Sequence, residues 1–236
     1  MKFERVDILL NIKFENEDFL VIDKPFGISF NNEHDSCGVF TLLQNQTGSN
    51  TLFPVHRLDK ITSGLLVIAK NQKTAAEFGK IFSDKKIQKY YLAISNKKPS
   101  KKQGLIKGDM ERSRRGSWKL TKSNNNPAIT QFFTYSIQSG LRLFLLKLHT
   151  GKTHQIRVAL KSIGSPICGD PIYSSNSNEH ERAYLHAYFL QFELFNKDYS
   201  FRSIPSSGEL FLLDTTKQLI EDLKNPDQEK WPKINP

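Results

Sequence analysis

The stretch VHRLDKITSGLLVIAK (residues 55–70) places three ionisable side chains, His56, Arg57 and Asp59, directly before an apolar run. Residues 64–69 have the composition of a short buried strand. Two interpretations of Asp59 are open. It either forms an ordinary Asx turn, accepting backbone N–H bonds from residues two positions on, or the strand is a rigid support for a reactive carboxylate.

The rest of the chain predicts more strands than helices. Strands are expected at 19–22, 87–94, 184–195 and 199–204, with a hairpin formed by ITQFFTYSI (129–137) and LRLFLLKL (141–148). Helical spacing occurs at 71–87, with Asn71 as N-cap, and at 153–164, ended by Gly164. Because this order is not a regular βαβ alternation, we expect an α+β fold with a mixed, largely antiparallel central sheet and flanking helices.

Length and composition predict one domain over residues 1–236, with its core at about 13–213 and a C-terminal tail at 214–236. No stretch approaches the roughly 18 apolar residues of a membrane span, and the charged N-terminus does not resemble a secretory signal. Cys37 and Cys168 fit neither a disulfide framework nor a metal site. We therefore expect a cytoplasmic, monomeric protein with free thiols, no metal and no membrane contact.

Positive charge is concentrated in one segment, residues 97–122. The chain has a formal net charge of +10, and this segment contains only two acidic residues, Asp109 and Glu111. Its basic residues are Lys97, Lys98, Lys101, Lys102, Lys107, Arg112, Arg114, Arg115, Lys119 and Lys122. Such clustering is typical of a nucleic-acid contact, and Trp118 adds a ring that can stack on bases. The alternative is a solvated lysine-rich loop. We expect an excursion from the fold.

A second basic pattern lies in LHTGKTHQIRVALKSIG (residues 148–164). Lys152, His154, Arg157 and Lys161 gather at the start and on one face of the predicted helix. A helix N-terminus has free N–H groups and a positive dipole end, which suit phosphate or carboxylate. The alternative is an amphipathic helix with a solvated basic face.

The two stretches together resemble the signatures of the RluA-type RNA pseudouridine synthases. HRLDKITSGLLVIAK is similar to H-R-L-D-x-x-T-S-G-hydrophobic-A-K, and KLHTGKTHQIRVAL followed by IGSPICGDPIYS is similar to the second signature. DFLVIDKPFGI, KYYLAI and YLHAYFLQFEL resemble the opening strand, the K-x-Y-x-A element and the closing piece. The matches run in family order from about residue 13 to about residue 205. The resemblance implies the pseudouridine synthase fold, in a compact member lacking an N-terminal S4-like RNA-binding module.

This resemblance implies an isomerase that converts uridine in structured RNA, rRNA or tRNA, to pseudouridine by base flipping, without a cofactor. It implies that Asp59 is the nucleophile, with either the sugar C1′ or the uracil ring as its target. Arg157 matches the arginine that partners the aspartate. Tyr91 matches a tyrosine placed against the target base, with a part in removal of the C5 proton, while its neighbour Tyr90 is expected in the core.

The resemblance also implies RNA contacts. Arg57 matches the arginine that fills or holds open the place vacated by the flipped base, and a structural salt bridge is its alternative role. The other predicted RNA-binding residues are Lys152, His154, Arg112, Arg114, Arg115 and Trp118. Lys152 stands where the family usually has arginine, so phosphate binding there should be weaker because the bidentate fork is missing. His56 is expected to be scaffold.

Two rival functions stay open at this point. One is a non-catalytic RNA-binding or RNA-folding module on the same fold. The other is a base-releasing glycosidase that uses Asp59, although such chemistry usually recruits a second carboxylate, and the motifs near Asp59 supply none.

Overall fold

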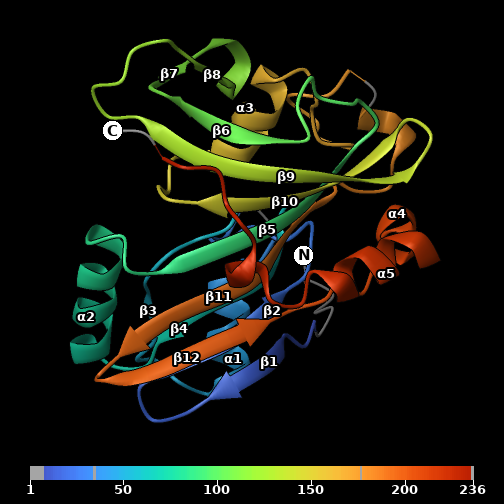
Figure 1. The fold of residues 1–236 in the computed structure, drawn as a ribbon. Helices are drawn as coiled ribbons and strands as arrows, with labels where there is room; N and C mark the ends of the chain where they lie inside the picture. The colour runs from blue at the N-terminus through green and yellow to red at the C-terminus, as the bar shows by residue number, and fades with distance from the viewer. Residues whose placement is uncertain (1–7, 34–35, 176, 235–236) are drawn as a thin grey trace.

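A ten-stranded sheet forms the centre of the computed structural model, which describes residues 8–33, 36–175 and 177–234 (Figure 1). Its strands are β1 (Asn11–Glu15), β2 (Phe19–Lys24), β3 (Phe53–Pro54), β4 (Ser63–Ala69), β5 (Gln88–Ser95), β6 (Gln103–Gly108), β9 (Ala128–Gln138), β10 (Leu141–Leu148), β11 (Leu185–Leu194) and β12 (Lys197–Arg202). The order is β1-β2-β4-β11-β5-β10-β9-β6, with β3 beside β4 and β12 beside β11.

All neighbouring strands of this sheet are antiparallel except β4 and β11, which are parallel. The flanking helices are α1 (Val39–Thr47), α2 (Gln72–Ser83), α3 (Gln155–Ser162), α4 (Glu209–Leu212) and α5 (Asp214–Asp222). The predicted α+β fold with a mixed, largely antiparallel sheet is confirmed. Within the described ranges, no helix combines the length and the apolar character needed to cross a bilayer.

Helix α2 begins where its sequence predicts but ends at Ser83, before the expected end at residue 87. Asn71 is its N-cap, and the Asn71 side chain accepts a hydrogen bond of 2.8 Å from the Thr74 N–H. Phe78 and Ile81 are buried on the face that packs against β4 and β11. The i, i+3 spacing of apolar residues therefore positions α2 over the strands next to the nucleophile loop.

Helix α3 differs from its prediction on one face. Its apolar residues are buried as expected, and Gly164, with φ +74°, follows its end. Arg157, however, is only 3% exposed, whereas Lys161 is exposed. The alternative of a solvated basic face is therefore wrong for Arg157, because a segment after the helix folds back and covers it.

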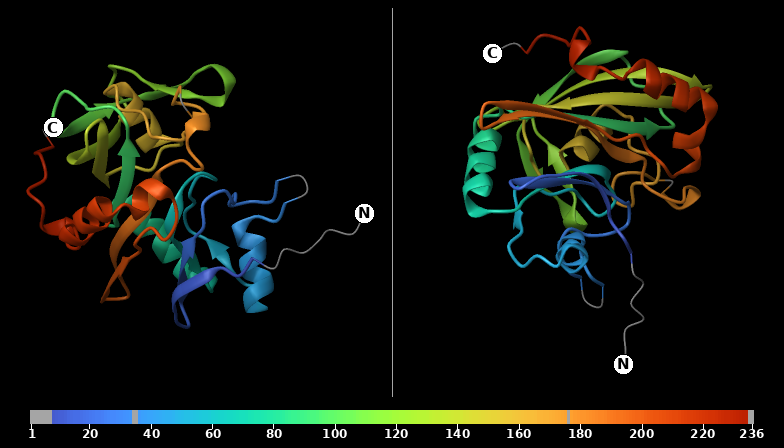
Figure 2. Two further views of the ribbon diagram at one scale, coloured as in Figure 1. Left: turned by 90° about the vertical axis from the view of Figure 1, so that its right-hand side faces the viewer. Right: turned by 90° about the horizontal axis from the view of Figure 1, so that it is seen from below.

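The parallel pairing of β4 with β11 joins two halves of the sheet. Strands β1 to β4 lie on one side, and β11, β12, β5, β10, β9 and β6 lie on the other (Figure 2). The pairing is only two residues long, with Ser63 opposite His186 and Gly64 opposite Ala187. A Cβ on Gly64, whose φ is +105°, would lie 2.3 Å from the Ala187 carbonyl oxygen. Only glycine permits so close an approach of two backbones.

Beyond this seam the two halves diverge, and an aromatic cluster fills the space between them. Phe19 on β2 has its ring centroid 5.6 Å from Phe192 on β11 and 5.0 Å from Tyr199 on β12. Phe78 of α2 contacts both phenylalanines. These edge-to-face contacts add to the burial of large apolar surfaces and hold the halves at one angle.

The basic segment 97–122 divides into two parts. Its first part contributes β6, which pairs with β9 at the edge of the main sheet. Its second part forms a separate hairpin of β7 (Met110–Arg112) and β8 (Trp118–Leu120), which packs against α3. The hairpin is an excursion from the sheet, whereas residues 97–102 connect β5 to β6.

The segment 214–236, expected as a tail, begins with α5 and is packed in its described part. The Tyr188 hydroxyl donates to the carbonyls of Ile220 and Leu223 at 3.1 and 3.2 Å. The Trp231 ring lies 4.9 Å from Phe133 and 5.7 Å from Tyr90. The segment therefore covers β9, β5 and β11.

Candidate active site

Hydrogen bonds fix the loop before β4 on both sides of Asp59. On one side, His56 Nε2 accepts the Val67 N–H at 3.0 Å, and burial lowers the pKa of His56 to about 3, so the ring is neutral. On the other side, the Lys60 carbonyl accepts the Gly27 N–H at 2.8 Å and Lys24 Nζ at 3.4 Å. His56 therefore has the scaffold role expected of it.

The carboxylate of Asp59 faces α3 rather than its own loop. The Thr62 N–H donates to the main-chain oxygen of Asp59 at 3.0 Å, and among the described residues no backbone N–H donates to the carboxylate. Oδ2 instead accepts a hydrogen bond of 3.2 Å from Arg157 Nη1 and lies 4.0 Å from His154 Nε2. The Asx-turn interpretation is therefore wrong for this structure.

Arg157 also binds a second carboxylate, Asp170, through a bidentate pair. Its Nε and Nη2 donate to the Asp170 oxygens at 2.7 and 2.9 Å, and the two side chains are 4% and 0% exposed. Burial alone would lower the pKa of Arg157, but the bonds to Asp170 and Asp59 raise it above its ordinary value. Arg157 is therefore a permanent cation with one N–H turned to Asp59.

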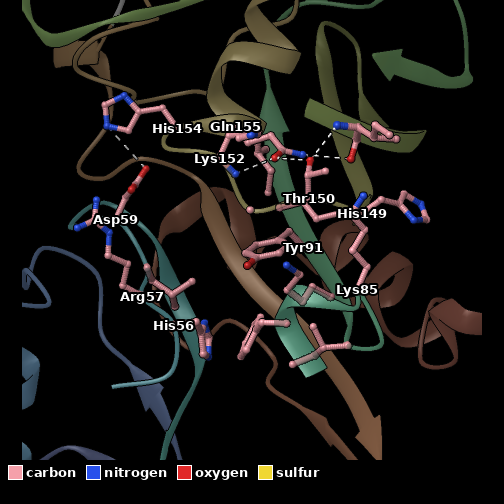
Figure 3. A pocket seen from close by; sticks show the side chains of 18 of the residues that line it. His56, Arg57, Asp59, Lys85, Tyr91, His149, Thr150, Lys152, His154 and Gln155 are labelled. Atoms are coloured by element: carbon pink, nitrogen blue, oxygen red, sulfur yellow. Dashed lines mark hydrogen bonds and ion pairs between the residues drawn. The ribbon is translucent and has the colours of Figure 1, made fainter. Parts of the chain in front are cut away.

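Asp59 opens into a pocket of ≈ 770 Å³ (Figure 3). This volume lies within the range of about 300–1,000 Å³ typical of small-ligand sites. The pocket is lined by the loop 55–62, by β5, by residues 125–129 and by the start of α3. Its cationic lining residues are Arg57, Lys85, Lys89, Lys152 and Arg157. Asp59 is the one acidic residue in the described lining, so the pocket attracts anions.

Tyr91 lies in this pocket on strand β5, across from the loop of Asp59 (Figure 3). Burial, and then the negative charge of Asp59, raise the pKa of Tyr91 well above its ordinary value. The side chain is therefore a protonated phenol at neutral pH. Tyr90 points to the other face of the strand, is fully buried and contacts Trp231, which confirms its predicted place in the core.

Arg57 lines the pocket and is exposed. In the part of the chain that the structure describes, no carboxylate lies within ion-pair distance of it, so the structural salt bridge is absent there. The guanidinium is free to contact a ligand. Its role toward the vacated base stays a prediction.

The structure brings some predicted RNA contacts to the pocket and leaves others outside it. Lys152 and His154 line the pocket. Arg112, Arg114, Arg115 and Trp118 lie instead on the β7–β8 hairpin, where the Arg112 guanidinium carbon is 5.6 Å from the Trp118 ring centroid. These four residues lie outside the pocket lining, and their contact with RNA stays a prediction.

Sequence reasoning missed three residues around the site: Lys89, Asp170 and Tyr173. Lys89 lines the pocket two residues before Tyr91, so the period of a strand places both on one face. Burial lowers the pKa of Lys89 to about 8. Asp170 and Tyr173 lie in the quoted stretch ICGDPIYS, but no local pattern showed that this stretch folds back onto α3. In the described ranges, no three His, Cys, Asp or Glu side chains gather as a metal site.

Comparison with known proteins identifies the class. Residues 18–162 match the family described as RNA pseudouridylate synthase, and the chain belongs to this family. It is 47% identical, over 90% of its length and 95% of the relative's, to an uncharacterized RNA pseudouridine synthase of Haemophilus influenzae. It is 34% identical to the ribosomal large subunit pseudouridine synthase D of Zymomonas mobilis, over 80% of this chain and 66% of that protein.

A solved structure shares the fold. The human RNA pseudouridylate synthase domain containing 1 superposes with a TM-score of 0.74 at 22% identity, covering 95% of this chain and 98% of that one. The sequence matches support an RNA pseudouridine synthase, an isomerase acting on RNA, over a non-catalytic binding module.

Proposed function

We propose that this protein isomerises uridine to pseudouridine in structured RNA with Asp59 as the nucleophile. The observation that carries the proposal is the hydrogen bond of 3.2 Å from Arg157 Nη1 to Asp59 Oδ2 at the edge of the pocket that contains Tyr91. These residues are 98 positions apart in the chain. The buried guanidinium holds one oxygen of a partly exposed carboxylate and so fixes the position of the nucleophile at the pocket.

The chemistry needs few groups. The N1–C1′ bond of uridine breaks, its electron pair stays on the base, and a C5–C1′ bond forms after the base turns. C5 loses a proton and N1 gains one, so atoms and charge balance. Asp59 forms a bond to C1′ or to the uracil ring and is released as a carboxylate at the end, which divides the barrier into smaller steps.

The pocket argues against a base-releasing glycosidase. That reaction usually needs two carboxyl groups at the glycosidic bond. Asp59 is the acidic residue of the described lining, and Asp170 is fully buried with both oxygens bound to Arg157. Asp170 therefore has no access to a substrate.

The target base must leave its stack to reach Asp59, at a cost of a few kcal/mol. Arg57, two residues before Asp59, is exposed and lines the pocket, and its planar guanidinium can stack in the vacated place. Tyr91 then packs against the extruded uracil. We infer that Lys152, which lines the pocket, contacts a flanking phosphate.

Ribosomal RNA and transfer RNA are the two proposed substrates. Relatives from Zymomonas mobilis and Rickettsia bellii are named for the ribosomal large subunit, which supports ribosomal RNA. Mapping of pseudouridines in cells that lack this protein distinguishes the two. We further propose that the protein acts as a cytoplasmic monomer, which sedimentation of the free protein and cell fractionation test.

The decisive experiment is tritium release from RNA labelled at C5 of uridine. Asp59→Asn should abolish release while RNA binding, measured by filter retention, stays within a factor of about two. Asp198→Asn, an exposed carboxylate on β12, is the matched control and should release tritium like the wild type. Undiminished release by Asp59→Asn would refute the assignment of the nucleophile.

A further inference from the structure

A chain of polar contacts leads from the basic hairpin to the nucleophile. The backbone N–H of Trp118 donates to the Tyr173 hydroxyl at 2.8 Å, and this hydroxyl lies 3.1 Å from His154 Nδ1. The other ring nitrogen of His154, Nε2, lies 4.0 Å from Asp59 Oδ2. We propose that His154 is a second N–H donor to the nucleophile, with Tyr173 as the positioning residue that keeps the proton on Nε2.

The tautomer follows from the need to pair the Tyr173 hydroxyl proton, since an Nδ1–H donated to the second lone pair of the hydroxyl would leave that proton without an acceptor among the described residues. A tyrosine hydroxyl has one proton to donate and two lone pairs that accept. One lone pair of Tyr173 is occupied by the Trp118 N–H, and His154 Nδ1 is the acceptor within reach of the hydroxyl proton among the described residues. An Nδ1 that accepts must be unprotonated. The proton of a neutral imidazole is then on Nε2, which faces Asp59.

His154 is neutral in the resting site. Burial, and then the positive charge of Arg157, lower its pKa below the ordinary value, although Asp59 and Asp170 act in the opposite direction and Arg57 adds a small lowering effect. The ring therefore offers the carboxylate one N–H without adding a full charge. A neutral donor stabilises the anion while leaving it more nucleophilic than a second cation would.

The backbone at His154 is held in an uncommon conformation. His154 has φ 57° and ψ 19°, in the left-handed region, directly before α3. A residue other than glycine adopts this region at a cost, and such residues concentrate at functional sites. The side chain is 16% exposed and lies at the carboxylate rather than at the pocket rim. Figure 3 shows the ring of His154 turned toward Asp59.

Tyr173 is fixed by the same group that fixes Arg157. Asp170 Oδ1 accepts the Tyr173 N–H at 3.1 Å as well as Arg157 Nη2 at 2.9 Å. The Arg157 guanidinium carbon also lies 5.0 Å from the centroid of the Tyr173 ring. Tyr173 therefore touches both partners of Asp59 and aligns them together.

This arrangement distinguishes the two oxygens of the carboxylate. Arg157 Nη1 and His154 Nε2 both approach Oδ2, whereas no described residue donates to Oδ1. Oδ2 is thus the anchored oxygen and Oδ1 keeps its lone pairs for bond formation. The separation of 4.0 Å between Nε2 and Oδ2 exceeds a hydrogen bond, and catalytic contacts commonly shorten when the substrate closes the site.

The tautomer can be measured without substrate. Nitrogen NMR of the intact protein labelled at histidine reports which ring nitrogen carries the proton, and the His154 signals are assigned from those missing in His154→Gln. We expect a protonated Nε2 in the wild type and a mixture of tautomers in Tyr173→Phe. A protonated Nδ1 in the wild type would overturn the inference while leaving Asp59 as the nucleophile.

Kinetics supply the second arm, which rests on the proposed function. His154→Leu should lower the single-turnover rate about tenfold or more, as loss of a hydrogen bond to a charged group implies, with RNA affinity nearly unchanged. His154→Gln, which retains an N–H near the position of Nε2, should recover part of that rate. Equal rates for the Leu and Gln variants, or a loss confined to RNA affinity, would contradict the role.

A matched variant controls for loss of a buried hydroxyl. Tyr173→Phe should lower the rate severalfold with RNA affinity unchanged. Tyr188→Phe loses hydroxyl bonds to the Ile220 and Leu223 carbonyls, outside the pocket lining, and it should lower the melting temperature without changing the rate. A Tyr173→Phe enzyme that loses only thermal stability would refute the positioning role.

Discussion

Asp170 binds Arg157 through hydrogen bonds from Nε and Nη2 and leaves Nη1 for Asp59. The pair is almost completely enclosed, with side-chain exposures of 4% and 0%. Asp170 also accepts the N–H groups of Ile172 and Tyr173, so both of its oxygens are satisfied. The direction of the Arg157 side chain is thus set by a residue that never meets the substrate.

Removal of Asp170 should be costly for stability. Asp170→Ala leaves the buried Arg157 with only Asp59 as an anionic partner, and breaking a buried pair typically costs about 3–5 kcal/mol. Urea unfolding of the variant measures this loss. The exposed Asp198→Ala should change the free energy of unfolding by no more than about 0.5 kcal/mol. A similar small effect at Asp170 would mean that the pair does not stabilise the fold.

RNA affinity should depend on the protonation of Lys89. Burial lowers the pKa of Lys89 to about 8, so its positive charge is present below that pH and absent above it. Affinity measured at constant salt should therefore fall between about pH 7 and 9. Lys89→Arg, which stays charged, should flatten this decline, whereas Lys80→Arg on the exposed face of α2 should not. An identical pH dependence in Lys89→Arg would exclude Lys89 as an RNA contact.

The hairpin should contribute to RNA affinity through charge. Replacing Arg112, Arg114 and Arg115 by Gln should weaken binding and reduce the salt slope by about 0.7–0.9 for each phosphate that is no longer neutralised. The control is a triple Gln variant at exposed lysines elsewhere: Lys197, Lys217 and Lys224. It removes the same charge and should leave the slope nearly unchanged. If both variants behave alike, the hairpin acts only through net charge.

Lys24 should make stability depend on pH. Burial, and then repulsion by Arg182, lower the pKa of Lys24 to about 7, whereas an unfolded lysine titrates near about 10.4. Between these values the unfolded chain binds the extra proton, so the free energy of unfolding should rise with pH, by up to about 1.4 kcal/mol per unit. Lys24→Met should reduce this slope, and the exposed Lys197→Met should not. An unaltered slope in Lys24→Met would mean that Lys24 is charged in the folded protein.

Local patterns predicted most strands of the sheet together with α2 and α3, because strand and helix periodicity survive in these elements. They did not predict α1, α4 and α5. The nucleophile loop and its arginine were predicted only through linked motifs, since Asp59 and Arg157 are distant in the chain. Arg157 illustrates the limit. Its position away from the apolar stripe indicated solvent, and only the segment containing Asp170, folded back onto α3, explains its burial.

The sequence did not predict which side chains contact one another across the fold, because the contacting residues are distant in the chain. Lys89 had a usable signal in its spacing from Tyr91. Tyr173 lay within the stretch that resembles the second signature, but its contacts depend on the hairpin strand that contributes the Trp118 backbone N–H. The basic segment has a uniform composition, yet its first part joins the main sheet and its second part forms a separate hairpin. Pairing with β9, rather than charge, decided which part entered the sheet.

The nucleophile and its arginine belong to different sides of the narrow β4–β11 junction, where Gly64 meets Ala187. A larger side chain at this contact would push β4 and β11 apart and tilt one side of the sheet relative to the other. The distance between the Arg157 guanidinium and the Asp59 carboxylate would then increase. Neither Gly64 nor Ala187 lines the pocket, yet their close packing sets the distance between the two reactive partners, so substitutions there should change turnover while the pocket side chains stay the same.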